Sequence, residues 1–256
     1  MAARKSRVPV FLFFIIIVSF PSCLLVKENR DNCPCRLEIQ LSGTHGAVSR
    51  VLVSAGEESW NFYAGRDTVL SVYVPKGRVS VTAWSGAEEP LDGVFLGTSG
   101  GGFPPLFLCH CALEARGEEI IAHARLRKQF CTLSVGMEGP PGWGRPIGTN
   151  VRGNVSGMDI FGGTHPGSFN CVPGKSAGGW SMRIPRQDPD SPLLLDIVMA
   201  DSVVRTFSLG SYLKEAGFDW SAPDLGDIDI RLNLSVTSLA VRAPTWESEA
   251  FLSIDI

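Results

Sequence analysis

Residues 227–236, DIDIRLNLSV, alternate strictly between polar and apolar side chains. Successive side chains of an extended strand point to opposite faces, so the aliphatic residues of this stretch would all lie on one face. These residues are Ile228, Ile230, Leu232, Leu234 and Val236. The pattern predicts an antiparallel strand with one buried face and one solvated face.

Shorter alternating stretches occur along the rest of the chain. They predict strands at 35–41, 48–54, 57–63, 106–113, 118–126, 129–136, 180–184, 193–199, 203–209 and 252–256. A hairpin is predicted at 67–84, where DTVLSVYV and RVSVTAW flank the turn Pro75-Lys76-Gly77. Residues 86–105 are predicted to be a loop. Helix is predicted only at 211–217, where Gly217 ends it.

The domain organisation follows from these short strands and from one breaker-rich segment. MEGPPGWGRPIGTN (137–150) is rich in proline and glycine and is the predicted boundary between domains. The sequence therefore predicts an all-β chain of two tandem β-sandwich domains with little helix, at residues 35–140 and 141–256.

The N-terminus has the pattern of an export signal. Basic residues at 4, 5 and 7 precede an apolar run at 8–20, which is shorter than the roughly 20 residues that span a bilayer. This predicts a signal peptide at 1–22, with an uncleaved membrane anchor as the alternative. Ser19-Phe20-Pro21-Ser22-Cys23 resembles a bacterial lipobox, so Cys23 is predicted to carry lipid and 23–34 to be a tether. The alternative is an ordinary cleavage site beside an incidental thiol.

Six cysteines remain without Cys23, an even number suited to an oxidising compartment. They are Cys33, Cys35, Cys109, Cys111, Cys131 and Cys171. Strand periodicity places several of them among core-facing aliphatic residues. Disulfides are the first interpretation, with fifteen possible pairings, and buried free thiols are the second. A metal site that includes His110 is the third, because a C-x-C strand would point His110 away from both sulfurs.

The sequence contains no recognisable catalytic, cofactor or metal motif. His45, His110, His123 and His165 stand in no H-E-x-x-H pattern, and G-x-S-x-G is absent. Asp227 and Asp229 are paired carboxylates, but on a strand they would lie on its solvent face. Without residues 1–22 the chain has 20 basic and 26 acidic residues, a net charge of −6 that gives no surface for nucleic acid. We therefore expect a non-enzymatic protein.

The order of several motifs resembles the fimbrillin superfamily of anaerobic Gram-negative bacteria. The segments are RDNCPCRLEIQL (30–41) after Cys23, YVPKGRVSVTAWSG (73–86), VRGNVSGMDIFGG (151–163), FSLGSYLKEAGFDW (207–220) and DLGDIDIRLNL (224–234). This resemblance implies two transthyretin-like β-sandwiches, export as a lipoprotein, and assembly at the outer-membrane surface in type V fimbriae. It also implies binding of the neighbouring subunit by β-strand complementation.

Within that superfamily the short tether favours an anchor or minor subunit over a shaft subunit. Cleavage at Arg30 would release the lipid and remove almost no strand, whereas cleavage at Arg50 would remove strand 35–41. The expected partners are fimbrial shaft or accessory subunits and the outer membrane. The alternative is a surface lipoprotein that binds glycans or other ligands through its loops, with exposed tryptophans as the candidate contacts. Those candidates are Trp143, Trp180, Trp220 and Trp246.

Overall fold

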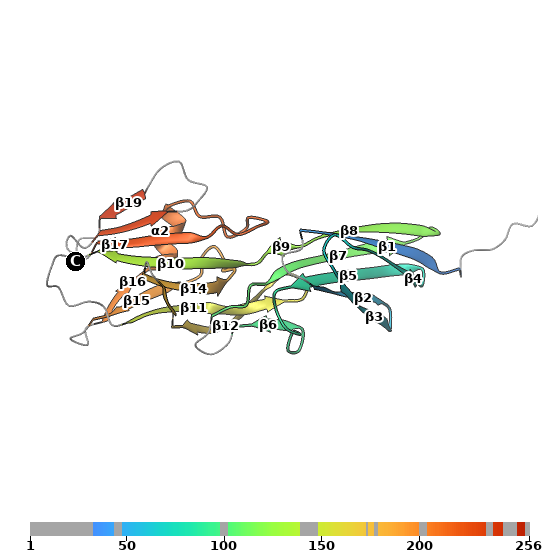
Figure 1. Ribbon diagram of the computed structural model, residues 1–256, viewed down its shortest axis with the longest axis horizontal. Helices are drawn as coiled ribbons and strands as arrows, with labels where there is room; N and C mark the ends of the chain where they lie inside the picture. Colours follow the sequence, from blue (N-terminus) through green and yellow to red (C-terminus); the bar gives the residue numbers. More distant parts are fainter. Residues whose placement is uncertain are drawn as a thin grey trace, which may run out of the picture.

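The computed structural model of the chain describes residues 33–43, 48–97, 102–138, 148–172, 174–176, 179–199, 204–233, 238–242 and 250–253. Strands dominate these ranges, and α2 (Leu209–Glu215) is the one helix within them. The all-β prediction is therefore confirmed. Two β-sandwiches lie end to end along the long axis of the molecule (Figure 1). In the described ranges no helix has the length and apolar character needed to cross a membrane.

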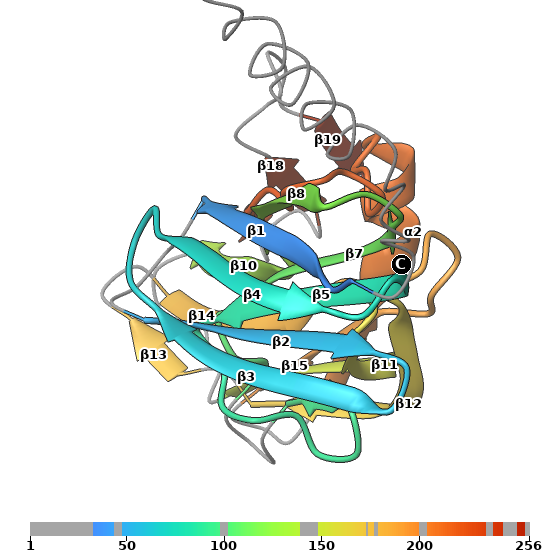
Figure 2. The ribbon, with the colours of Figure 1, turned by 90° about the vertical axis from the view of Figure 1, so that its right-hand side faces the viewer.

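The first sandwich packs a three-stranded sheet on a five-stranded sheet. In the smaller sheet β1 (Cys35–Ser42) lies between β4 (Val69–Val74), to which it is antiparallel, and β8 (Glu119–Arg125), to which it is parallel. The larger sheet has the order β3 (Glu58–Ala64), β2 (Ser49–Ala55), β5 (Gly77–Ser85), β7 (Phe107–Ala115) and β9 (Arg127–Lys128). Figure 2 shows the two layers, with β1 and β4 in one and β2 and β3 in the other.

The second sandwich is built from β10 onward. One sheet has the order β13 (Gly174–Ser176), β14 (Gly179–Pro185), β10 (Phe130–Glu138), β17 (Ile228–Asn233), β18 (Ser238–Arg242) and β19 (Ala250–Ser253). The other has the order β12 (Thr164–Cys171), β11 (Gly148–Asp159), β15 (Leu194–Val198) and β16 (Val204–Phe207). β6 (Val94–Leu96), from the first half of the chain, also pairs with β11.

The two sandwiches repeat one topology. In each, the first strand lies between an antiparallel and a parallel neighbour: β1 between β4 and β8, and β10 between β14 and β17. The opposite sheets are equivalent as well. The order β3-β2-β5-β7 in the first sandwich corresponds strand by strand to β12-β11-β15-β16 in the second. The tandem arrangement predicted from the sequence is therefore a structural repeat, although the sequence shows no internal repetition.

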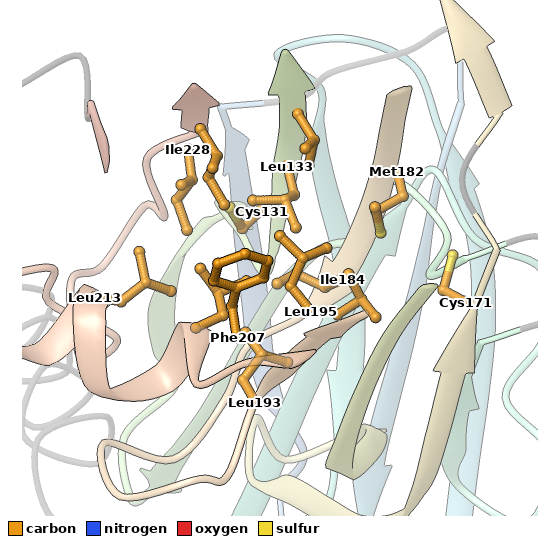
Figure 3. Packing of buried hydrophobic residues seen from close by; sticks show 14 of the residues in the cluster. Cys131, Leu133, Cys171, Met182, Ile184, Leu193, Leu195, Phe207, Leu213 and Ile228 are labelled. Atoms are coloured by element: carbon orange, nitrogen blue, oxygen red, sulfur yellow. The ribbon is translucent and has the colours of Figure 1, made fainter. Parts of the chain in front are cut away.

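Each sandwich has its own apolar core. In β17 the side chains of Ile228, Ile230 and Leu232 are buried, as the opening alternation predicts. Full burial of such a side chain contributes about 1.5–3 kcal/mol relative to exposure. They pack with residues from the facing sheet and from α2, including Leu195 and Leu213 (Figure 3). β17 is antiparallel to β18 but parallel to β10, so only one of its two pairings is the predicted antiparallel kind.

The hairpin predicted at 67–84 does not form. β4 pairs with β1, whereas β5 pairs with β2 and β7 in the opposite sheet. The residues between β4 and β5 therefore cross from one layer of the sandwich to the other. The physical reason is that turn residues reverse the chain in either case, and only long-range packing decides whether the two strands become partners.

The pairing of β10 bears on where the boundary between the domains is drawn. The strand expected at 129–136 to close the first domain is β10, which pairs with β14 and β17 of the second sandwich. The proline- and glycine-rich segment 137–150 joins β10 to β11, and thus links the two sheets of one sandwich. Breaker residues mark a turn without specifying what the turn connects. We propose that the second domain begins at residue 129 or 130.

Other elements differ in smaller ways from the predictions. The predicted loop at 86–105 contains β6. β11 and β12 lie between the strands predicted at 129–136 and 180–184, where alternation predicted no strand. The predicted helix is confirmed as α2, two residues earlier than expected. It is followed by Gly217, whose φ of +76° suits glycine at a helix C-terminus. The signal peptide 1–22 and most of the tether 23–34 lie outside the described residues.

An ion pair between the mostly buried Asp196 and the exposed Arg152 of the second sandwich gives a prediction for stability. Asp196 of β15 accepts hydrogen bonds from Arg152 Nε at 2.6 Å and Arg152 Nη2 at 3.0 Å, and from the Thr206 hydroxyl at 2.7 Å. Its side chain is only 10% exposed. The Arg152 hydrogen bonds hold the pKa of Asp196 below its ordinary value. The stabilisation is therefore complete above pH 4 and disappears as the pH falls through the lowered folded-state pKa.

We expect Asp196→Asn to lower the free energy of unfolding at pH 7 by about 1–3 kcal/mol, because a buried charge-assisted network loses its acceptor. The variant should also lose part of the wild-type acid sensitivity below about pH 4. Urea titrations at several pH values measure both effects. Asp190→Asn is the matched control, because Asp190 accepts from Lys214 at the same 2.6 Å but is 84% exposed. Equal destabilisation by the two variants would contradict the prediction.

Candidate functional site

An apolar flank runs along one side of the first sandwich, between the edge strands β3 and β4. Its inner side carries Trp60 and Phe62 of β3 and Leu70 and Val72 of β4, and all four are only partly buried against the core. We call this the β3–β4 flank. Beside it, Tyr63, Val69 and Tyr73 are 68%, 58% and 66% exposed. Aromatic and aliphatic side chains therefore lie on both faces of these two strands.

Both strands of the flank are open sheet edges. β4 pairs only with β1 and β3 only with β2, and within the described residues no strand pairs with their outer edges. Neither strand contains lysine, arginine or proline, the residues that usually protect an edge from pairing. The edge formed by β8 is different, because Glu119, His123 and Arg125 are exposed along it. The β3–β4 flank is thus the less protected side of the sandwich.

The second sandwich shows how the equivalent edge is covered. β14 corresponds to β4 in the repeated topology, and its outer edge pairs with the short strand β13. β17 corresponds to β8, and it is extended by β18 and β19. In the described part of the first sandwich the positions equivalent to β13 and β18 are occupied by no strand. The repeat therefore identifies a place beside β4 where an additional strand fits the architecture.

The junction between the sandwiches is firmly connected. Trp84, Phe95, Phe103, Phe130 and Met158 belong to a third apolar cluster, to which both halves of the chain contribute. Arg183 of β14 exchanges hydrogen bonds with the backbone of residue 103. Ion pairs join Lys128 to Asp227 at 2.6 Å and Arg127 to Asp224 at 2.8 Å. These contacts hold the β3–β4 flank in a defined direction relative to the second sandwich.

A cavity of about 470 Å³ opens at this junction. Leu91 and Leu96 contribute exposed apolar surface to it, Phe95 and Phe103 lie buried in its wall, and Glu88 and Glu89 are at its rim. Glu89 is paired with Arg50, whose guanidinium also lies 5.4 Å from the ring centroid of Tyr63. The cavity is thus a concave feature near the β3–β4 flank, lined by apolar surface and acidic groups.

The six cysteines predicted as disulfide candidates are free thiols in the structure. Cys35 lies in the core of the first sandwich, and Cys131 and Cys171 lie in the core of the second (Figure 3). Burial raises the pKa of each of these three thiols, so they stay protonated near neutral pH. This arrangement fits the second alternative from the sequence, in which buried thiols act as small apolar side chains. Cys33 is exposed, and Cys109 and Cys111 lie partly buried on β7.

The histidines do not gather into a site. His110 points away from the flanking cysteines, shares a hydrogen bond with the Thr82 hydroxyl at 2.9 Å, and stacks edge-on with Phe161. Burial lowers the pKa of His110. His123 and His165 lie on β8 and β12, and His45 lies outside the described residues. Among the described residues no three His, Cys, Asp or Glu side chains are grouped to hold a metal ion.

Asp227 and Asp229, which the sequence places two residues apart, have different environments in the structure. Asp227 accepts hydrogen bonds from Lys128 Nζ and from the Thr132 backbone N–H at 2.7 Å. Burial alone would raise its pKa, but these donors hold the pKa of Asp227 below its ordinary value. Asp229 is one of the outward-facing residues of β17. Asp227 is thus a structural residue of the junction, a role that the sequence did not indicate.

The remaining predicted site residues can be placed only in part. Trp220 is buried in the core of the second sandwich, so it is not the exposed ligand contact that the glycan alternative required. Trp180 of β14 is partly buried. Cys23, Trp143 and Trp246 lie outside the described residues. The β3–β4 flank was missed because each strand alone gives an ordinary alternating pattern, although the absence of charged residues from β4 is a signal visible in the sequence.

Comparison with solved structures finds similar folds. The chain is similar to a candidate polysaccharide-binding protein from Bacteroides thetaiotaomicron, with a TM-score of 0.62 and 11% identity over 86% of this chain and 98% of the other. It is similar to a candidate adhesin from Bacteroides ovatus, with a TM-score of 0.61 and 10% identity over 86% and 95%. It is also similar to the fimbrial anchor protein Mfa2 from Porphyromonas gingivalis, with a TM-score of 0.58 and 11% identity over 84% and 98%.

No protein-family model matches the chain, and no curated protein matches it in sequence. The structural similarity extends over nearly the whole length of the three solved proteins, so both sandwiches and their arrangement are shared. The chain therefore has a fimbrillin-like fold, as the motifs in its sequence implied.

Proposed function

We propose that this chain is a non-catalytic anchor or minor subunit of a fimbrium at the bacterial outer membrane. In this proposal a lipid on Cys23 attaches the chain to the membrane. The β3–β4 flank accepts an extended strand from the neighbouring fimbrial subunit. The open, uncharged edge of β4 is the observation that carries the proposal, together with the fold shared with a fimbrial anchor protein.

The mode of binding follows from the chemistry of the flank. A strand beside β4 would form backbone hydrogen bonds with its free edge, which supply affinity without sequence specificity. Alternate side chains of the added strand would point inward and contact Leu70, Val72, Trp60 and Phe62. The incoming segment is therefore expected to alternate apolar and polar residues. The firm junction would transmit load from the added strand to the rest of the molecule.

The proposal is tested in cells that produce this chain. Tagged wild-type chain, extracted from membranes, should co-purify with fimbrial polymer, and its deletion should change the length or the attachment of the fimbriae. Electron microscopy and fractionation of sheared fimbriae measure these effects. Complementation with the unaltered gene is the control. Fimbriae of normal length and attachment in the deletion strain would contradict the proposal.

Ligand binding is the alternative function, and the junction cavity is the observation that favours it. A sugar could lie against the exposed side chain of Leu91 while its hydroxyl groups donate hydrogen bonds to Glu88. The similar protein described as a candidate polysaccharide binder agrees with this reading. Glycan-array binding that is lost on Glu88→Ala would favour it over the fimbrial role, and an empty array would exclude it for the sugars tested.

A further inference from the structure

Two thiols lie side by side on the inner face of β7, on the flank opposite β3 and β4. Cys109 pairs with Ala83 and Cys111 with Val81, and both of these partners are buried in the core. The two cysteines therefore share the inner face of the strand. Both remain partly exposed, because β9 pairs only with the first two residues of β7. Both side chains therefore lie two residues apart on one face of the strand, and neither is completely buried.

The spacing of these thiols suits a bridging ion better than a disulfide. Residues i and i+2 of a strand have Cα atoms about 6.7 Å apart, with nearly parallel side chains. A disulfide needs Cβ atoms only about 3.5–4.5 Å apart, so it would require the strand to distort. Two metal–sulfur bonds of about 2.3 Å span roughly 4.6 Å in a linear arrangement. Each sulfur reaches that separation by leaning about 1 Å along the strand.

The number of ligands selects the kind of ion. Zn²⁺ takes four ligands, and the described residues hold no third His, Cys, Asp or Glu grouped with this pair. His110, which lies between the cysteines in sequence, is on the other face of β7 with Thr82 and Phe161. Soft thiolate ligands favour Cu(I), an ion that two thiolates alone can satisfy.

The surroundings keep both thiols protonated until a metal ion binds. Each side chain lies in a partly buried position, where burial disfavours the charged form of the thiol. The positive charge of Arg127 acts on Cys109 as well. Without metal, burial raises the pKa of Cys109 to about 11 and also raises the pKa of Cys111, so both thiols are protonated at neutral pH. Metal binding would displace those protons.

We propose that Cys109 and Cys111 form a two-coordinate binding site for a soft monovalent ion of the Cu(I) class. Cu(I) and two thiols would give a bis-thiolate complex with a net charge of −1 and release two protons. Neither copper nor sulfur changes oxidation state, so no oxidant is needed. The site lies on the side of the first sandwich opposite the proposed strand-binding edge. It is independent of the proposed fimbrial role.

The site is tested on the reduced full chain under anaerobic conditions. Cu(I) is titrated in competition with a chromophoric Cu(I) chelator, and native mass spectrometry gives the stoichiometry. We expect one Cu(I) per chain, with two sulfur neighbours in X-ray absorption. Cys109→Ser and Cys111→Ser should each weaken binding by about 100-fold or more, because the chelating second ligand is lost. Circular dichroism establishes that each variant is folded.

The chain supplies its own matched control. Cys33 and Cys35 have the same C-x-C spacing, but Cys33 is exposed and Cys35 is completely buried. The double variant C33S/C35S should therefore bind Cu(I) as the wild type does. Absence of Cu(I) binding to the wild type would overturn the proposal. Unchanged binding by folded Cys109→Ser, or loss of binding in C33S/C35S alone, would also overturn it.

Discussion

Leu70→Arg is expected to abolish binding of the neighbouring fimbrial subunit, with affinity reduced by at least about 100-fold. Leu70 lies on the inner side of β4, opposite Ile39 of β1, and is only partly buried in the isolated chain. An added strand would cover this position. In the variant it would remove the arginine guanidinium from water and supply no partner charge. An uncompensated buried charge costs about 3–5 kcal/mol, and 100-fold corresponds to only about 2.8 kcal/mol.

The isolated variant should remain folded, because the arginine of free Leu70→Arg can reach water through the open flank. Binding is measured with fimbriae sheared from the cells that produce this chain, immobilised on a sensor surface. Circular dichroism and thermal unfolding report the fold. A large loss of thermal stability would show instead that Leu70 belongs to the closed core, which would contradict the open flank.

Ile121→Arg is the control for this experiment on the opposite edge strand. Ile121 is 45% exposed on β8, the opposite edge of the same three-stranded sheet. The substitution is chemically the same, and the edge already carries charged residues, so binding should change little. If Ile121→Arg abolished binding and Leu70→Arg did not, the strand would bind beside β8 and the assignment to β4 would be wrong.

Cys23→Ser is expected to release the chain from the membrane almost completely. Each buried methylene of an acyl chain contributes about 0.8 kcal/mol, and two or more chains make attachment stable. Serine has no thiol to accept the lipid, so the variant should appear in the soluble fraction or accumulate with its signal peptide. Fractionation with immunoblotting gives the distribution. Mass spectrometry of the wild-type N-terminus should find acylated Cys23.

Cys33→Ser separates lipidation from a general effect of losing a cysteine. Cys33 is exposed and makes no disulfide, so this variant should stay in the membrane fraction. Membrane retention of Cys23→Ser at the wild-type level would refute lipid anchoring through Cys23. A mature N-terminus after Arg30, Arg36 or Arg50 would instead identify a polymerising subunit, from which the lipid has been removed.

Local patterns predicted individual strands well and their partners poorly. β1, β10 and β17 were placed within a few residues, because alternation follows directly from the geometry of an extended chain. β11 and β12 were missed because glycines at 153 and 157 in β11 and at 167 in β12 interrupt the alternation. There, Gly157 permits close approach, since a Cβ would lie 2.2 Å from the backbone oxygen of Phe95.

The candidate sites, too, were predicted where they depend on local sequence and missed where they depend on strand pairing. The C-x-C spacing indicated that Cys109 and Cys111 share an inner face, and the structure agrees. The sequence did not indicate that this face remains accessible, because accessibility depends on how far β9 extends along β7. Likewise, the sequence of β4 lacks charge, but only the sheet order shows that β4 is an edge.

By itself, the sequence determined that the chain is all-β, where most strands lie, and which of their faces are apolar. These properties depend on residues close together in the chain, so the two-residue period of a strand records them directly. Only the tertiary structure decided that β4 and β5 lie in different sheets, that β10 begins the second sandwich, and that the two sandwiches share one topology. Strand pairing joins residues that are distant in sequence, and many pairings satisfy the same local pattern. The pairing that forms is the one that buries both cores together, and it leaves one uncharged edge beside β4 open.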